Sequence, residues 1–342
     1  MKKEDFVILL KAVPKAELHL HAEGTISIST VRKFLERNPT PKYEGEKINK
    51  LFHYESLKEF IRSFLFIQDL FVEPSDFELL FDDVANYLSN NNIIYCELFF
   101  SPSMFLKKRM DFKEILDVMS RKIEQIKAEK NIIIKLIIDI SRTFGYENAK
   151  RNLELVLKYR NQHIIGIGLG GDEIKGPAVK FKDLFHIAKD NNLHLVAHAG
   201  EDADSSSVWD AIKELGAERI GHGIASIKDK ELIAYLKETQ IPLEICVTSN
   251  VFTKKFVSEI EKHPVKQFYE EGILVTINTD DPTFFNTSLV EEYWKIHDKL
   301  NFSLSDLLNL VINGFKASFL PDKEKEGFIK KAKEVWNKNL QI

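Results

Sequence analysis

The sequence has few cysteines, no excess of basic residues and no long hydrophobic run. Its only cysteines in 342 residues, Cys96 and Cys246, both lie in apolar stretches. They cannot form a Cys-x-x-Cys metal site, and we expect buried, reduced thiols in a cytoplasmic protein. The net charge is −4, with 48 Lys and Arg against 52 Asp and Glu, so the balance gives no indication of a nucleic acid or an anionic membrane as partner.

Three further absences narrow the class of protein. The apolar run at residues 6–10 is short and no cleavage pattern follows it, and no stretch reaches the ~18 apolar residues of a membrane-spanning helix. Gly/Ser-rich or Pro-rich linkers are missing, so we expect residues 1–342 to form one domain. No Gly-x-Gly-x-x-Gly motif follows the first predicted strand, which disfavours the alternative of a doubly wound sheet that binds dinucleotides.

Apolar, β-branched runs alternate along the chain with amphipathic helical patterns. The predicted strands are 15–21, 93–100, 132–140, 164–171, 194–198, 219–222, 242–246 and 274–279. The predicted helices are 26–37, 55–72, 75–91, 112–129, 147–160, 179–191, 206–216, 228–240 and 263–271, with three more from about residue 289. Eight such units predict an α/β protein, a (β/α)₈ TIM barrel, with a helical insertion at 45–91 after the first strand and extra C-terminal helices.

Polar side chains cluster where the predicted strands end, which is where barrels of this kind place their active sites. These strand ends carry His19, His21, Glu23, Ser101, Gly170, Gly171, Asp172, Glu173, His198, Glu201, His222, Thr248, Ser249, Asn250, Asp280 and Asp281. One histidine at a strand end is usually an ordinary hydrogen-bonded residue, and Asp-Asp-Pro is usually a turn. The joint occurrence of four histidines and several carboxylates at one rim predicts a metal site.

The ligand types favour one zinc ion. His19, His21 and His198 offer imidazoles and Asp280 offers a carboxylate, a set that suits catalytic zinc with an open position for water. A second, lysine-bridged metal is disfavoured because the fourth strand contains no lysine.

The remaining polar residues suit catalysis beside such a metal. Zinc lowers the pKa of a water ligand to roughly 7. His222 and Asp281 are placed to orient or deprotonate that water, and Glu201 is the natural general acid if its pKa is raised. A backbone N–H of Gly171 can approach a flat ligand closely, because glycine has no Cβ.

The chain resembles the adenosine deaminase family of the amidohydrolase superfamily. The resemblance rests on six segments that occur in the family's order between about residues 12 and 320. They are Glu17-Leu-His-Leu-His21, Gly168-Leu-Gly-Gly-Asp-Glu173, His198-Ala-Gly-Glu201, Arg219-Ile-Gly-His-Gly223, Thr248-Ser-Asn250 and Asn278-Thr-Asp-Asp-Pro282.

The resemblance implies a zinc-dependent hydrolytic deaminase of a small-molecule purine. It implies one Zn²⁺ held by His19, His21, His198 and Asp280. It also implies that Glu201 protonates the purine N1, that His222 orients and polarises the zinc-bound water, that Asp281 fixes the hydroxide and lies near N7, and that the Gly171 amide contacts N3. The helical insertion with Phe60, Phe64 and Phe66 would match the family's lid, and ordinary helix packing is the alternative for those rings.

Two positions depart from the adenosine-specific pattern. Glu23 stands where adenosine deaminases usually have the Asp that binds the 5′-hydroxyl, and Phe99-Phe100-Ser101 stands where the family often has an Arg before the aromatic residue. The segment Thr287-Ser-Leu-Val-Glu-Glu-Tyr293 after the eighth predicted strand is more similar to the nucleoside branch of the family than to the free-base branch. We predict a 6-aminopurine nucleoside, adenosine or a 5′-modified adenosine, with His21, Glu23, Ser101, Gly171 and Asp281 in contact with it.

Several other functions stay open on the sequence. Adenine deaminase and aminodeoxyfutalosine deaminase are the alternatives within the family. Another mononuclear amidohydrolase and a non-catalytic barrel are less favoured, because the complete set of polar residues is present. The cytidine type of deaminase is excluded by the lack of a Pro-Cys-x-x-Cys motif.

Overall fold

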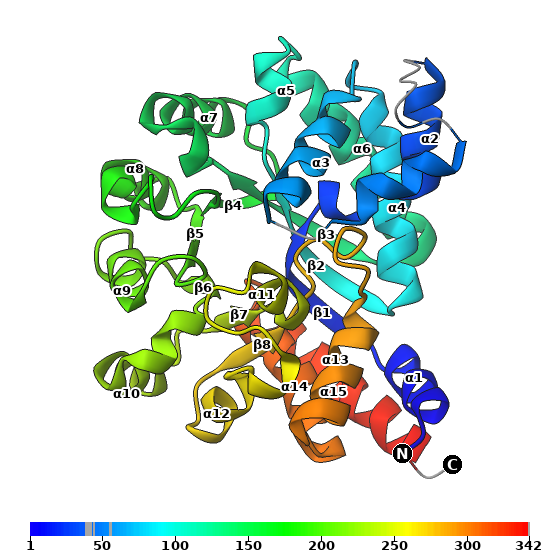
Figure 1. Ribbon diagram of the computed structural model, residues 1–342, viewed down its shortest axis with the longest axis vertical. Helices are drawn as coiled ribbons and strands as arrows, with labels where there is room; N and C mark the ends of the chain where they lie inside the picture. Colours follow the sequence, from blue (N-terminus) through cyan, green and yellow to red (C-terminus); the bar gives the residue numbers. More distant parts are fainter. Residues whose placement is uncertain (38–42, 44, 55–56, 341–342) are drawn as a thin grey trace.

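Eight parallel strands form the centre of the molecule and helices surround them (Figure 1). The computed structural model describes residues 1–37, 43, 45–54 and 57–340. The strands are β1 Lys15–His21, β2 Ile93–Phe100, β3 Ile133–Asp139, β4 Ile164–Leu169, β5 His194–Ala199, β6 Arg219–His222, β7 Leu243–Ile245 and β8 Val275–Ile277. Each strand pairs with the next in sequence order. The predicted (β/α)₈ barrel is thus confirmed, and the bounds of five of the eight strands differ from the prediction by one or two residues at an end.

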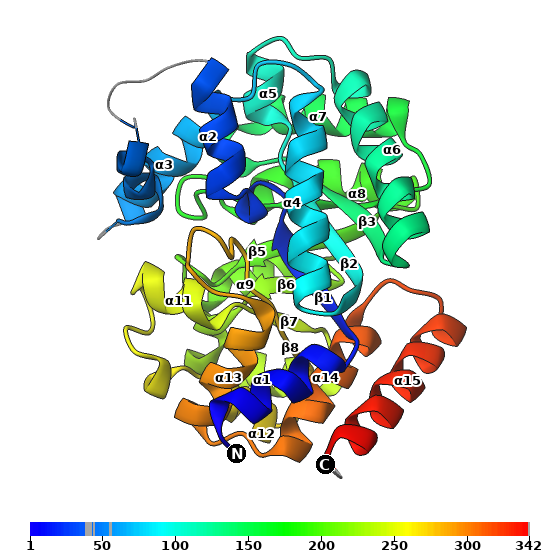
Figure 2. The same cartoon turned by 90° about the vertical axis from the view of Figure 1, so that its right-hand side faces the viewer.

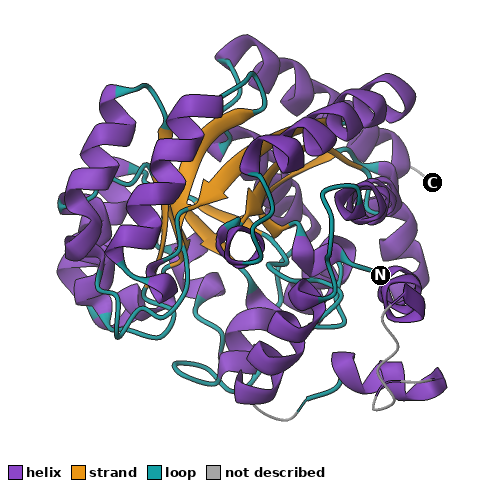
Figure 3. Ribbon diagram, turned by 90° about the horizontal axis from the view of Figure 1, so that it is seen from above, coloured by secondary structure: helices purple, strands orange, loops and turns teal. Residues whose placement is uncertain are grey.

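The helices form a nearly continuous outer layer, which Figure 3 shows from above. They are α1 Lys3–Ala12, α2 Ile28–Arg37, α3 Leu57–Asp69, α4 Asp76–Asn90, α5 Ser103–Lys107, α6 Phe112–Lys130, α7 Tyr146–Tyr159, α8 Lys182–Asp190, α9 Ser205–Lys213, α10 Lys230–Thr239, α11 Val247–Thr253, α12 Val265–Glu270, α13 Leu289–Leu300, α14 Leu304–Ala317 and α15 Asp322–Leu340. Among the helices of the described residues, none combines the length and the hydropathy needed to cross a bilayer.

The strands are apolar on both faces because both faces are covered. The outer faces of the strands pack against the helices, as expected for a parallel sheet. Inside the barrel, Phe99, Ile137 and Val196 form a small separate cluster, and Phe319 packs against it. The barrel interior is therefore a filled core, and space for chemistry exists only at its end.

Three helices were not predicted from the sequence. Helix α1 contains the run 6–10, and its buried Phe6, Leu9 and Leu10 have the helical spacing i, i+3, i+4. It packs beside α13 and α15 (Figure 2). Helix α5 is only five residues long, and α11 begins immediately after the three-residue β7, so neither gives a clear periodicity.

The predicted helical insertion is present in part of its range. The structure has a 3₁₀ segment at Gly45–Phe52, helix α3 and helix α4 between the first two strands. Residues 55–56 at the start of the predicted helix 55–72 lie outside the described residues. The three predicted C-terminal helices are α13, α14 and α15.

Candidate active site

The barrel closes where β8 meets β1, and this junction carries three of the predicted metal ligands. The His21 amide donates to the Asp280 carbonyl oxygen at 3.0 Å, and the Asp280 amide donates to the His19 carbonyl oxygen at 3.1 Å. Below them, the Asn278 side-chain oxygen accepts from the Leu18 and His19 amides at 2.9 and 3.2 Å. The Asn278 side chain thus replaces part of the backbone hydrogen bonding between β8 and β1. The pairing of the two segments places His19, His21 and Asp280 next to one another.

Five polar side chains converge at this end of the barrel. Ligand atoms of His19, His198, His222 and Asp280 all lie within 4.8 Å of one another. His21 lies immediately beside this group, with Nε2 at 3.2 Å from Asp280 Oδ1 and 3.3 Å from His198 Nε2. The geometry therefore brings together all four predicted metal ligands and, in addition, His222.

Neighbouring side chains fix how the ligands point. Glu244 accepts from His19 Nδ1 at 2.8 Å, which leaves the Nε2 lone pair directed at the cluster. Ser249 donates to Asp280 Oδ2 at 2.7 Å, so the other oxygen faces the histidines. His19 Nε2 is buried and has no hydrogen-bond partner, as expected for an atom that awaits a ligand. These residues fit zinc, whose usual donors are imidazole nitrogens and a carboxylate.

The backbone at two of these residues is in the left-handed region. His222 has φ of 61° and Asp280 has φ of 66°. Residues other than glycine seldom adopt this backbone conformation, and where they do it often marks a functional site. The preceding Gly221 gives His19 the room it needs, since a Cβ there would lie 2.7 Å from His19 Cε1. The strand ends are thus shaped around the imidazoles.

Glu201 lies at the rim of the cluster, where its carboxyl can hold a proton. Its Oε2 is 3.4 Å from His222 Nε2, and its side chain is 21% exposed. Burial, together with the negative charges of Asp280 and Asp202, raises the pKa of Glu201 well above its ordinary value. A protonated carboxyl at neutral pH is what a general acid requires.

A second glutamate holds the loop that carries Glu201. The Glu173 carboxylate accepts from the backbone amides of Gly200, Glu201, Asp202 and Ala203 at 2.6–3.1 Å. The sequence places Glu173 at a strand end but gives it no role. Its position shows that it fixes the loop after β5, and with it the placement of Glu201.

Asp281 and Glu23 lie on the other side of the cluster, and both are buried. Burial and the charge of Asp280 raise the pKa of Asp281 to about 8, and its Oδ1 has no hydrogen-bond partner. Burial raises the pKa of Glu23 to about 7, and Gln68 of α3 donates to its Oε1 at 3.2 Å. Glu23 therefore connects the cluster to the helical insertion.

The other predicted substrate contacts are placed differently. Gly171 is exposed with φ of 100°, and a Cβ there would lie 2.1 Å from Thr143 Oγ1, so only glycine fits this turn. Ser101 is half-buried directly after β2, and the hydrogen bonds of the described residues include none from Ser101 to the histidines. The structure thus brings Glu201, His222, Asp281 and Glu23 to the cluster but leaves Ser101 outside its hydrogen bonds.

Three residues at the site have no role in the sequence-based prediction, which names Phe99 only as a departure from the family pattern and does not name Asp139 or Arg142. The Phe99 ring packs against His19, His21 and His198 with ring centroids 5.0–5.5 Å apart. Asp139 ends β3 and accepts from the Gly170 amide at 2.9 Å. Arg142 is buried and donates to the His198 carbonyl oxygen at 2.7 Å. The strand-end rule would have found Asp139, whereas the other two roles depend on tertiary contacts.

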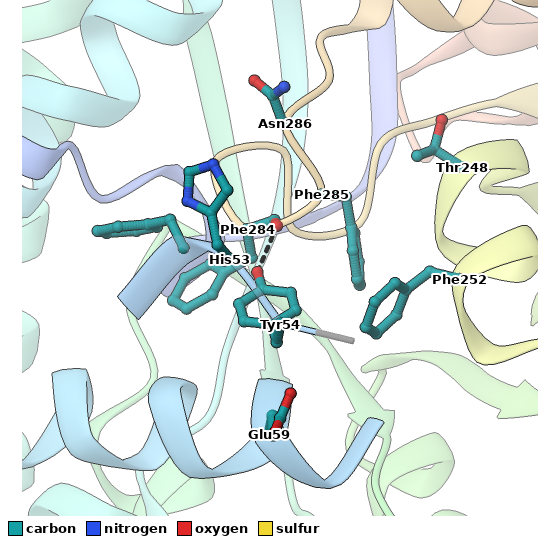
Figure 4. Close-up of a pocket in the computed structure, with 9 residues that line it drawn as sticks. His53, Tyr54, Glu59, Thr248, Phe252, Phe284, Phe285 and Asn286 are labelled. Carbon is teal, nitrogen blue, oxygen red and sulfur yellow. Dashed lines mark hydrogen bonds between the residues drawn. The ribbon is translucent and has the colours of Figure 1, made fainter. Parts of the chain in front are cut away.

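An aromatic pocket of about 600 Å³ adjoins the site (Figure 4). It is lined by Phe52, His53, Tyr54, Glu59, Thr248, Phe252, Phe284, Phe285 and Asn286. Tyr54 donates a hydrogen bond to the Phe284 carbonyl oxygen, drawn as a dashed line in Figure 4. Since the Phe285 amide bonds to the Asp281 carbonyl oxygen, this wall is directly joined to the catalytic rim.

Two of the three phenylalanines predicted to form a lid face this pocket wall. The Phe60 ring stacks on Phe285 with centroids 5.1 Å apart, and Phe64 lies 5.1 Å from Phe284. Phe66 instead contacts Tyr43 at 4.7 Å. Phe60 and Phe64 therefore join α3 to the loop after β8, while Phe66 packs against Tyr43, which precedes the insertion.

The chain is similar to one family and to several curated proteins over most of its length. The model of the family described as adenosine deaminase matches residues 14–335. An aminodeoxyfutalosine deaminase of Streptomyces avermitilis is 35% identical over 92% of this chain and 89% of that protein. An adenine deaminase of Wolinella succinogenes is 34% identical over 94% of this chain and 97% of that protein. An adenosine deaminase of Clostridium kluyveri is 33% identical over 91% of this chain and 91% of that protein.

Solved structures show the same fold. The adenine deaminase from Arthrobacter aurescens superposes with a TM-score of 0.90 at 26% identity, covering 95% of this chain and 99% of that one. The N6-methyl-AMP deaminase from Arabidopsis thaliana superposes with a TM-score of 0.82 at 26% identity, covering 97% and 98%. All of these similar proteins are named as deaminases, and the substrates in their names are aminodeoxyfutalosine, adenine, adenosine and N6-methyl-AMP.

Proposed function

The chain belongs to the adenosine deaminase family, and on that premise we propose that it converts a 6-aminopurine nucleoside to the 6-oxo product and ammonia. Family membership makes it a hydrolytic deaminase acting on purines. The observation that most supports this chemistry is Glu201, a carboxyl of raised pKa within 3.4 Å of His222 Nε2 at the edge of the His–Asp cluster.

The metal in this proposal is one zinc ion held by His19, His21, His198 and Asp280. The unpartnered Nε2 of His19 and the mixed imidazole and carboxylate donors support this assignment. Zinc bound there supplies a nucleophile at neutral pH by lowering the pKa of a water molecule.

The residues of the chain perform the remaining steps. Glu201 donates its proton to the purine N1, which makes C6 more electrophilic. His222 and Asp281 orient the attacking water, whose oxygen bonds to C6, and the Gly171 amide contacts N3. One proton of the water passes to the amino group, the C6–N6 bond breaks and ammonia leaves. The other water proton restores the proton that Glu201 gave to N1, so one water is consumed for each ammonia released.

The adjoining pocket favours a nucleoside over a free base or a nucleotide. Its volume of about 600 Å³ lies in the range that holds drug-sized ligands, which is more than a purine ring needs. Its described lining contains five Phe and Tyr rings and the polar residues His53, Glu59, Thr248 and Asn286, but neither Lys nor Arg, the residues that bind phosphate most strongly. The ribose and an apolar 5′ substituent are therefore the groups that suit this space.

Two substrates remain as second candidates within the same reaction. Aminodeoxyfutalosine is a 5′-modified nucleoside, and it is supported by the Streptomyces avermitilis relative and by the aromatic pocket. Adenine is supported by the Wolinella succinogenes relative.

A substrate panel separates these possibilities. The zinc-loaded protein is incubated with adenosine, 5′-substituted adenosines, adenine and AMP, and the loss of 6-aminopurine absorbance is followed. We expect kcat/KM to be highest for a nucleoside and lowest for AMP. Preference for adenine would shift the proposal to the free base, and no deamination of any of them, with zinc shown to be bound, would contradict it.

A further inference from the structure

A line of hydrogen bonds runs from the backbone at the start of α12 to His222. The Val265 amide lies 3.1 Å from His263 Nδ1, and His263 Nε2 lies 3.2 Å from Asn250 Oδ1. Asn250 Nδ2 in turn lies 3.0 Å from His222 Nδ1. All three side chains are buried, so these contacts are sheltered from water.

The Val265 amide determines which group donates and which accepts in each hydrogen bond of this line. A backbone N–H can only donate, so His263 Nδ1 must accept. A neutral imidazole then carries its proton on Nε2, which donates to Asn250 Oδ1. With its oxygen engaged there, Asn250 presents its NH₂ group to His222, and His222 Nδ1 must accept.

His263 has the protonation state that this direction requires. Burial lowers the pKa of His263 to about 3, so the ring is neutral under ordinary conditions. A charged ring would carry a proton on both nitrogens and could not accept from Val265.

The hydrogen bond at Nδ1 determines what the other nitrogen of His222, Nε2, can do in the reaction. With Nδ1 accepting, the neutral ring carries its proton on Nε2, and this atom lies 3.4 Å from Glu201 Oε2. Nε2 is buried and makes no hydrogen bond, because the contact with Glu201 lacks hydrogen-bond geometry. A protonated nitrogen has no lone pair for a metal, so His222 differs from His19, whose Glu244 contact leaves Nε2 free to ligate.

We propose that His263 is a positioning residue that acts through Asn250 to keep the proton of His222 on Nε2. His222 then donates a hydrogen bond to the oxygen that attacks the purine and does not ligate the metal. This role rests on the proposed deaminase function, and it assigns different tasks to two histidines that lie equally close to the cluster.

Matched variants separate the hydrogen-bond role of His263 from its packing. His263→Gln keeps an N–H group near the position of Nε2, whereas His263→Phe keeps a ring but cannot donate. Asn250→Asp keeps the bond from His263 and removes the donor to His222, so it draws the His222 proton to Nδ1. His163→Phe removes a buried histidine before β4, far from the site, and serves as the control.

Kinetics on the zinc-loaded protein give the first readout. We expect His263→Phe and Asn250→Asp to lower kcat by about 10–100-fold, with KM changed by less than about threefold. We expect His263→Gln and His163→Phe to stay within about threefold of the parent kcat. Equal losses for His263→Gln and His263→Phe would show that packing, and not the hydrogen bond, matters.

The ¹⁵N NMR spectrum of histidine-labelled protein gives a readout that does not depend on turnover. The His222 signals, identified by their loss in His222→Gln, should show Nε2–H in the parent and Nδ1–H in Asn250→Asp. Nδ1–H in the parent would overturn the proposal, even if His263→Phe failed to fold. If the parent deaminates no 6-aminopurine, the proposed function fails, while the NMR result still decides the position of the proton.

Discussion

Two clusters of buried charge lie at opposite ends of the barrel strands, and they differ in how their groups are paired. Toward the N-terminal end, Arg219 bonds to Glu244 at 2.5 Å and also pairs with Glu97, which accepts from Tyr95 at 2.7 Å. At the C-terminal end, the buried side-chain atoms that make no hydrogen bond include His19 Nε2, His222 Nε2 and Asp281 Oδ1. Pairing offsets the cost of burying charged groups, whereas a buried polar atom without a partner costs stability and indicates a site that binds something.

Glu244 joins the two clusters. One of its oxygens pairs with Arg219 and the other accepts from His19. Burial alone would raise the pKa of Glu244, but the Arg219 charge and the His19 contact outweigh it and lower the pKa. The paired end thereby supplies a fixed carboxylate that orients His19, a proposed metal ligand, at the unpaired end.

The largest effect should follow from removing the carboxylate of the unpaired end. Asp280→Ala deletes a proposed ligand, so we expect loss of both zinc retention and activity, measured by metal analysis after dialysis against a chelator and by ammonia release. The exposed Asp183, which pairs with Tyr146, provides the control Asp183→Ala, which should retain both. Full zinc retention in Asp280→Ala would contradict the ligand assignment.

A second substitution at the same end should separate binding from turnover. Glu201→Gln keeps the shape of the side chain but removes the acid, so we expect kcat to fall by about 10²–10⁴-fold while zinc stays bound. Glu214→Gln, at an exposed ion pair with Lys182, should be unchanged. An active Glu201→Gln would mean that another group protonates the purine.

At the paired end, substitution should change stability before activity. Arg219→Met leaves Glu97 and Glu244 buried and unpaired, so we expect a loss of about 3–5 kcal/mol in the free energy of unfolding, measured by chemical denaturation. Arg121→Met breaks an exposed pair with Glu78 and should cost about 0–1 kcal/mol. Equal costs for the two variants would remove the distinction between the clusters.

An effect that is visible only as a dependence of stability on pH concerns Lys15, another buried charge at the N-terminal end. Its Nζ bonds to the carbonyl oxygens of Leu10 and Val13, and burial lowers the pKa of Lys15 to about 7. Between this value and the unfolded value of 10.5 the unfolded chain binds one more proton, so stability rises with pH in this window.

Lys15→Met tests this sign. Relative to the variant, the parent should gain up to about 1.4 kcal/mol per pH unit between pH 7.5 and 10, measured by denaturation at several pH values. The same slope in parent and variant would show that Lys15 stays charged in the folded protein.

The residues of the site could be predicted from the sequence more fully than the contacts between them. The barrel and the strand-end residues were predicted, because strands buried on both faces leave continuous apolar runs and the active end of a barrel follows from strand direction. The sequence predicts Asn250 at the end of the seventh strand, whereas it lies in α11, since polar residues after a three-residue strand give no helical period. Its bonds to His222 and His263 join segments far apart in sequence, which no local pattern encodes.

The bond from Glu173 to the Glu201 loop was hidden for the same reason. Both residues were named as strand ends, but their contact joins the segments after β4 and β5 and depends on how the barrel packs. The residue types at the rim can be predicted from the order and spacing of the strands in the sequence. The hydrogen-bond partner of each polar atom cannot be predicted in this way.

The location of the metal tests the central claim most directly. Crystals of the zinc-loaded protein would be measured on both sides of the zinc absorption edge, which places the ion without reference to the side chains. We predict one anomalous peak per chain, bonded to His19, His21, His198 and Asp280, with His222 outside bonding distance. A peak bonded to His222 Nε2, or an active protein with no peak at this end of the barrel, would contradict the account.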